Sequence, residues 1–184
     1  MLDTLKYGLL KKGVVTKADV DRSSVGELLE ENKNIEELGK RLNDKIRKTF
    51  GRSLAIREVD AGSCNGCEVE VNALSNAIYD IERFGLKIVA SPRHADMLLV
   101  TGPVSRNMEH ALRQTYDATP APKLVIAMGA CAKDGGIFRD SYAVLNGVAN
   151  VVPVDVYIPG CPPKPDAIIQ GIMLALDKVK KNSK

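Results

Sequence analysis

Five short apolar runs, each leading into a loop that contains glycine or proline, constrain this chain more than any other feature. The runs are rich in Val, Ile and Leu, as expected of strands that are buried on both faces of a sheet. Several segments between them have helical periodicity, and this alternation predicts βαβ units and a mostly parallel sheet. The expected strands are residues 54–59, 86–90, 97–101, 124–128 and 154–158, and the expected helices are residues 34–49, 68–82, 107–117 and 164–180.

The first 50 residues differ from this pattern. Apolar residues recur at helical spacing from Ile35 to Phe50 and predict a helix with one apolar stripe. That stripe either packs on the core of its own domain or docks on a partner subunit, and the sequence leaves both alternatives open. We expect an N-terminal helical extension at residues 1–50, used for partner docking, and one domain at residues 51–184.

Composition excludes some classes of function. The chain of 184 residues is 45% hydrophobic and 27% charged, which is ordinary for a globular protein. Its net charge is only +3 and it lacks an aromatic RNA-binding signature, so no nucleic-acid partner is expected. No apolar run reaches the roughly 18 residues of a membrane span, and the first residues lack a signal-peptide pattern. These features predict a cytoplasmic protein, whose thiols stay reduced.

The chain has four cysteines, at positions 64, 67, 131 and 161. Cys64 follows the first expected strand, Cys131 follows the fourth, and Cys161 follows the fifth. Because the carboxyl ends of parallel strands share one edge of a sheet, we expect these cysteines and Cys67 to converge in the crevice where such folds bind ligands.

Glycines flank the cysteine loops, among them Gly66 and Gly129. Glycine lets the backbone approach closely and adopt positive φ, so that N–H groups can point at sulfur. The backbone amides of Gly66, Cys67 and Gly129 are therefore candidates for hydrogen bonds to a bound centre. Pro162 and Pro163 stiffen the last of these loops.

Three chemistries use four thiols. An iron–sulfur cluster held by four thiolates fits one CxxC pair plus two isolated cysteines, and it is the favoured hypothesis. A tetrahedral zinc site usually pairs two CxxC knuckles, and only one pair is present. A disulfide or redox-active CxxC pair would leave Cys131 and Cys161 unexplained. A stand-alone zinc- or disulfide-bearing binding domain remains an alternative.

The motifs SCNGCEVE, SPRHAD followed by LLVTGPV, VIAMGACAKDGGIF and VPVDVYIPGCPPKPDAIIQG occur in this order. Over residues 54–178 the chain resembles the small iron–sulfur subunit shared by energy-converting (group 4) membrane-bound NiFe hydrogenases and respiratory complex I. The resemblance implies an α/β, flavodoxin-like fold with helices on both faces of the sheet. It also implies one 4Fe–4S cluster, whose ligands match Cys64, Cys67, Cys131 and Cys161 one by one.

The same resemblance implies a role in electron transfer. Such a subunit passes electrons between a ferredoxin-like iron–sulfur subunit and a site on a large subunit, in an ion-translocating complex with membrane-arm subunits. It lies on the cytoplasmic side of the membrane and is not catalytic alone. Complex I subunits carry two adjacent cysteines where this chain has Cys64-Asn65-Gly66-Cys67, so the spaced pair favours the hydrogenase branch. Reduction of quinone or of sulfane sulfur remains the alternative.

Two further residues are candidates for contacts around the cluster or at the interface with the large subunit, in addition to Gly66 and Gly129. Glu70 either stabilises the start of a helix through its charge or makes a polar contact near the large-subunit site. Arg93 either lies near the cluster or binds a partner carboxylate. Glu68 is expected to be solvated or interfacial.

Overall fold

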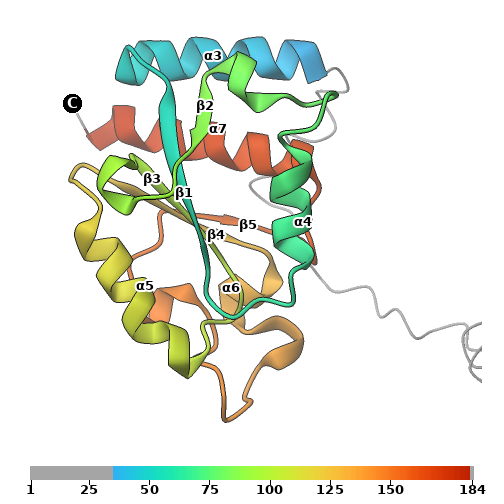
Figure 1. Cartoon of the computed structure of the whole chain (residues 1–184), viewed down its shortest axis with the longest axis vertical. Helices are drawn as coiled ribbons and strands as arrows, with labels where there is room; N and C mark the ends of the chain where they lie inside the picture. The colour runs from blue at the N-terminus through green and yellow to red at the C-terminus, as the bar shows by residue number, and fades with distance from the viewer. Residues whose placement is uncertain (1–34, 183–184) are drawn as a thin grey trace, which may run out of the picture.

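The computed structural model describes residues 35–182, which form a five-stranded sheet with helices on both faces (Figure 1). All strand pairs are parallel, and the strand order is β2-β1-β3-β4-β5. This is the flavodoxin-like order of doubly wound sheets, so the expected fold class is confirmed. The strands are β1 (Leu54–Asp60), β2 (Leu86–Ile88), β3 (Met97–Thr101), β4 (Leu124–Met128) and β5 (Val156–Ile158).

Two apolar clusters fill the space between the sheet and its helices. The cluster on one face joins α3, α4 and α7 to the sheet, and the cluster on the other face joins α5 and α6 to it. The helices are α3 (Ile35–Phe50), α4 (Gly66–Ala73), α5 (Arg106–Ala118), α6 (Ala130–Asp134) and α7 (Pro165–Asn182). Four 3-10 turns connect them: η1 (Ile81–Phe84), η2 (Pro92–His94), η3 (Gly136–Phe138) and η4 (Val148–Asn150). None of the helices within residues 35–182 is long and apolar enough to cross a membrane.

The apolar stripe of α3 packs on the core of this chain. Leu38, Leu42 and Ile46 are 0–1% exposed and belong to the same cluster as α7 residues. The two helices lie side by side in Figure 1, and Lys45 on α3 forms an ion pair with Asp177 on α7. The stripe therefore packs on the core of its own chain, which is one of the two alternatives that the sequence left open, and docking of the N-terminal extension on a partner stays a prediction. The remainder of that extension, residues 1–34, lies outside the described residues.

Close packing of α3 on η1 requires a glycine at position 39. A Cβ atom built there would lie 2.3 Å from the ring of Phe84, which is only 7% exposed and has little room to move. Alanine in a helix interior is favoured over glycine by about 1 kcal/mol, but overpacking a core costs about 1–3 kcal/mol.

We expect the clash to dominate, so Gly39→Ala should lower the free energy of unfolding by up to about 2 kcal/mol. Urea denaturation would measure this change. Lys40→Ala, on the exposed face of the same helix, is the control and should change stability little. A Gly39→Ala chain more stable than the parent would contradict this packing.

The helix expected at residues 68–82 is shorter than predicted. It ends at Ala73, and the chain then forms turns before η1. The Asn76 side chain accepts hydrogen bonds from the backbone N–H groups of Ile78 and Tyr79, which supports a turn at that point. Ile78, expected on the apolar face of the helix, is 63% exposed as a result.

Candidate metal centre

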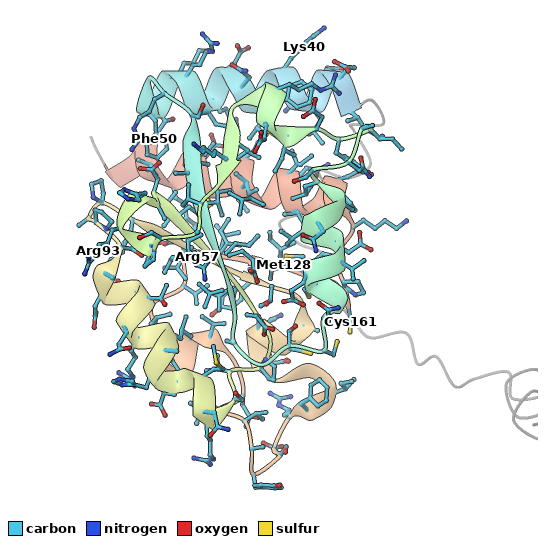
Figure 2. All side chains as sticks on the ribbon, viewed as in Figure 1. Lys40, Phe50, Arg57, Arg93, Met128 and Cys161 are labelled. Atoms are coloured by element: carbon cyan, nitrogen blue, oxygen red, sulfur yellow. The ribbon has the colours of Figure 1, made fainter. Side chains whose placement is uncertain are left out.

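All four cysteines converge at the carboxyl edge of the sheet. They line one cavity of about 110 Å³, together with residues of the cysteine loops and of the loop after β3: Ser63, Gly66, Gly102, Ala130, Gly160 and Pro162. In Figure 1, β1 runs from α3 down to this edge, and Figure 2 labels Cys161 there. The convergence expected from the strand ends is therefore present.

Each cysteine reaches the cavity from a different backbone setting. Cys64 lies in the loop after β1, and Cys67 is the second residue of α4. Cys131 is the second residue of α6, and Cys161 follows β5 and forms a cis peptide bond with Pro162. Cys67 and Cys131 are partly buried, whereas Cys64 and Cys161 are exposed, and all four are free thiols. The site is thus closed towards the sheet and open towards the surface.

Backbone hydrogen bonds fix the loops that carry the cysteines. Gly129 N–H donates to the Ile158 carbonyl at 2.8 Å, and Ala130 N–H donates to the Gly160 carbonyl at 2.8 Å, which joins the ends of β4 and β5. Ala61 N–H similarly donates to the Thr101 carbonyl at 3.0 Å, joining the ends of β1 and β3. The thiols are therefore positioned by the sheet itself.

Glycine at position 129 makes room for sulfur. Its φ of 90° lies in the region that side chains rarely adopt, and a Cβ atom there would lie 2.9 Å from Cys67 Sγ. At Gly136, a Cβ atom would lie 3.0 Å from Cys131 Sγ. Backbone without side chains thus lies directly against two of the four sulfurs, as a bound inorganic centre would require.

Two of the four thiols have raised pKa values because they are partly buried. Burial raises the pKa of Cys67 to about 12, and the Glu68 charge and the other three cysteines add to the increase. Burial also raises the pKa of Cys131, with further contributions from Cys161 and Cys64. A bound metal deprotonates its thiol ligands, so a cationic centre at this site would stabilise the thiolates of Cys67 and Cys131.

Two kinds of metal centre are commonly held by four thiolates, a zinc ion and an iron–sulfur cluster. Within residues 35–182, no three His, Cys, Asp or Glu side chains are grouped to hold a single metal ion. A mononuclear zinc site, with Zn–S bonds of about 2.3 Å, would require such a group. A four-iron cluster binds each thiolate to a different iron atom and needs a wider ring of cysteines. The four thiols of the cavity match the number of thiolate ligands of a 4Fe–4S cluster.

The sequence did not predict that the Glu68 carboxylate holds the first cysteine loop by hydrogen bonds. Glu68, expected to be solvated or interfacial, is partly buried: its Oε2 accepts from Ser63 Oγ at 2.5 Å, and its Oε1 accepts from Thr101 Oγ1. Ser63 Oγ also accepts from the backbone N–H of Asn65 at 2.9 Å. The sequence did contain a sign of this contact. Thr101 is the one polar residue of an otherwise apolar strand, and it faces the α4 side of the sheet.

The other expected site residues have different locations. Gly66 and Gly129 lie at the thiols, as described. Glu70, on α4, is close enough to raise the pKa of Tyr79, a residue whose pKa is affected more strongly by burial and by Asp166. Glu70 therefore lies near the α4–α7 contact, and a role towards a partner stays a prediction.

Arg93 lies at the opposite edge of the sheet from the cysteines. It lines a separate cavity of about 520 Å³ with Phe50, Arg52 and Asp96, and Figure 2 labels it far from Cys161. The reason is that β2 ends after three residues, opposite Ile56 in β1, so the chain never reaches the cysteine edge before β3 begins. Arg93 cannot contact the thiol cavity, and only its contact with a partner stays a prediction.

Comparison with known proteins is consistent with this geometry. Residues 64–175 match the family described as NADH ubiquinone oxidoreductase, 20 Kd subunit. The chain is 48% identical to the probable membrane-bound hydrogenase subunit mbhJ of Pyrococcus furiosus, over 77% of this chain and 87% of that one. It is 44% identical to an NADH-quinone oxidoreductase subunit of Bacteroides thetaiotaomicron, over 82% and 81% of the two chains.

A solved structure adds a third relative. A chain in the archaeal membrane-bound sulfane sulfur reductase superposes with a TM-score of 0.63 at 37% identity, covering 77% of this chain and 76% of that one. The family match spans more than half of the chain and includes all four cysteines. The chain therefore belongs to the family of the 20-kDa subunit of NADH ubiquinone oxidoreductase.

Proposed function

We propose that this chain is the electron-transfer subunit of a membrane-bound oxidoreductase complex and holds one 4Fe–4S cluster on Cys64, Cys67, Cys131 and Cys161. The observation that carries the proposal is that all four cysteines of the chain line one cavity at the carboxyl edge of the sheet. When bound, the cluster would supply one-electron redox chemistry. The chain contributes no acid, base or nucleophile to bond chemistry in this proposal.

The role of the protein is then to set the environment of the cluster. Burial of Cys67 and Cys131 on the sheet side excludes water, and the first-turn N–H groups of α4 and α6 have no acceptor inside their own helices. Such amides, together with exposure and local charge, tune the potential of a cluster. Glu68 adds a fixed acidic group beside Cys67, which favours a low potential.

A partner subunit would cover the open side of the site. Cys64 and Cys161 are exposed there. Ile137, six residues after Cys131, is 79% exposed, and Val69, two residues after Cys67, is 57% exposed. Exposed apolar side chains beside a functional site are typical of an interaction surface. We infer that a hydrogenase-like or complex I-like large subunit docks here, and that electrons pass across this contact.

The remaining partners would place the chain in a larger assembly. A ferredoxin-like iron–sulfur subunit would exchange electrons with the cluster, and membrane-arm subunits would hold the complex at the cytoplasmic side of the membrane and translocate ions. The similarity to subunits of three membrane or quinone-linked complexes supports this arrangement.

The spaced pair Cys64–Cys67 and the similarity to mbhJ favour a hydrogenase-type complex. The structural similarity to a chain of the sulfane sulfur reductase favours a second candidate, reduction of sulfane sulfur, and quinone reduction is the third. These functions differ in the metal of the large subunit.

Metal analysis of the intact complex, purified without oxygen through a tag on this chain, tests the hydrogenase branch. A hydrogenase-type complex should contain nickel and evolve hydrogen from a reduced low-potential donor. A complex that contains iron without nickel, and that reduces polysulfide or a quinone instead, would overturn the hydrogenase branch while keeping the electron-transfer role. A chain that purifies with no iron would overturn the proposal itself.

A further inference from the structure

A second cavity lies at the amino edge of the sheet, and the electron-transfer function assigns it no role. It has a volume of about 520 Å³ and is formed by the end of α3, by η2 and by the loop that precedes β4. Three of its lining side chains are basic and one is acidic: Arg52, Arg93, His94 and Asp96. The charge that the cavity presents to a ligand depends on which of these side chains are already paired.

The acidic member, Asp96, is paired within the chain. Arg52 donates from Nη2 to Asp96 Oδ1 at 2.6 Å and from Nη1 to Asp96 Oδ2 at 2.9 Å. The backbone N–H of Ala55 also donates to Oδ2, at 3.0 Å, and the Asp96 side chain is only 12% exposed. The charges of Arg52 and Asp96 therefore compensate each other, and Asp96 does not neutralise a further cation.

Arg93 and His94 supply the uncompensated positive charge and the free donors. Both side chains are exposed, and neither forms a hydrogen bond or an ion pair with any of residues 35–182. A guanidinium group stays protonated and presents its donors in a planar fork that matches a carboxylate. The His94 ring adds at least one N–H donor. The cavity is therefore suited to an anionic group.

The rest of the lining is apolar and rigid. Phe50 and residues 120–122, the sequence Pro-Ala-Pro, also line the cavity, and proline fixes the backbone φ. Asp96 N–H donates to the Ala55 carbonyl at 2.8 Å, and Leu124 N–H donates to the Asp96 carbonyl at 3.2 Å, which ties these segments to the sheet. A preformed site loses little conformational entropy when it binds. Its apolar wall suits a peptide in which an acidic residue has an apolar neighbour.

Strand β3 separates this cavity from the cysteines. Asp96, directly before the strand, lines the amino-edge cavity, and Gly102, directly after the strand, lines the thiol cavity. A rise of about 3.3 Å per residue places the two cavities on the order of 20 Å apart. Figure 2 accordingly labels Arg93 far from Cys161. A segment bound at the amino edge is thus remote from the surface that covers the thiols.

We propose that the amino-edge cavity binds an acidic segment of a second partner subunit, distinct from the large subunit that covers the cysteines. An Asp or Glu side chain of that segment accepts hydrogen bonds from Arg93 and His94, and an apolar neighbour packs against Phe50 and the Pro-Ala-Pro sequence. The exposure of Arg93 and His94 favours a protein over a small molecule, because small-molecule sites enclose most of their ligand. A concave site with an apolar wall also fits a peptide better than it fits a flat membrane surface.

This inference needs the complex but not the cluster, so the two can fail separately. The photo-crosslinking residue p-benzoylphenylalanine is introduced at Ala121, an exposed position of the cavity lining, and the intact complex is irradiated. The same residue at Ile137, beside the cysteines, is the reference and should reach the large subunit. We expect Ala121 to cross-link to a segment that contains Asp or Glu, in a subunit other than the large one.

The other outcomes are equally informative. Cross-links from Ala121 to lipid, to a segment without acidic residues or to the large subunit would overturn the inference, and so would the absence of any cross-link from Ala121. An Ile137 probe that reaches no large subunit would instead count against the docking proposed for the cysteine face.

Charge reversal in the same complex makes the attribution specific. Arg93→Glu should lower the amount of the cross-linked subunit that co-purifies with this chain by at least about tenfold, because like charges across an interface repel. Arg93→Lys keeps the charge without the planar fork and should have a smaller effect. Lys40→Glu, exposed on α3, is the control and should have none. Changing the identified carboxylate to arginine should restore binding to Arg93→Glu.

The EPR signal assigned to the four cysteines separates this inference from the proposed function. It should persist in Arg93→Glu, because Arg93 does not reach the thiols. Parental co-purification of every subunit with Arg93→Glu would overturn the inference while leaving the cluster in place. An absent EPR signal with no iron in the parent complex would instead refute the proposed function.

Discussion

Replacing Cys131 by alanine is expected to abolish the 4Fe–4S centre of this chain. Cys131 is partly buried on α6 and faces the cavity that it shares with the other three cysteines, and the chain has no fifth cysteine to replace it. A 4Fe–4S cluster has four thiolate ligands. Iron should fall below about four atoms per chain, and the EPR signal of the reduced 4Fe–4S cluster should disappear.

Loss of the centre must be distinguished from loss of the fold. The cluster-free forms of the parent and of Cys131→Ala should have similar circular dichroism and similar denaturation midpoints, because a thiol is replaced by a smaller apolar group at a partly open site. Ser75→Ala, an exposed change in the turn after α4, is the matched control and should keep full iron content. A Cys131→Ala chain with an unchanged EPR signal would contradict the ligand assignment.

The second large effect is expected at Gly129. Its φ is 90°, and a Cβ atom there would lie 2.9 Å from Cys67 Sγ. Gly129→Ala should therefore displace the Cys67 thiol and prevent cluster binding, in addition to backbone strain of about 1–3 kcal/mol. Iron content and denaturant unfolding, measured on the same preparations, separate the two effects.

Gly51 is the matched control for this prediction. It also has positive φ, at 67°, but a Cβ atom there would have no neighbour within 4 Å. Gly51→Ala should cost about 1–2 kcal/mol of stability through backbone strain alone, and the cluster should be retained. If Gly129→Ala and Gly51→Ala lost iron to the same degree, backbone strain alone would explain the loss. The close approach of Gly129 to the Cys67 sulfur would then not be its cause.

Patterns that repeat along the chain predicted the fold and the convergence of the cysteines. The apolar runs identified all five strands, and β3 and β4 have the predicted bounds. Since parallel strands end at one edge, three strand ends sufficed to bring four thiols together. These inferences depend on periodicity and topology, which sequence carries directly.

Features that depend on contacts between distant segments could not be predicted. The early end of α4 follows from a turn around Asn76, and Arg93 lies at the far edge because β2 stops opposite Ile56. The hydrogen bond that Glu68 accepts from Thr101 joins two segments that are distant in the sequence. The apolar stripe of α3 could have packed on this chain or on a partner subunit. Only the structure shows that the stripe packs with α7 on the chain's own core.

The central claim is that the four cysteines hold one 4Fe–4S cluster. The most direct test is iron and acid-labile sulfide analysis of the anaerobically purified wild-type complex, combined with EPR before and after reduction. We expect about four iron and four sulfide per chain of this subunit, beyond those of its partners, and a signal that appears on one-electron reduction and is lost in Cys131→Ala. One zinc ion per chain, or a Cys64–Cys67 disulfide with no iron, would contradict the account.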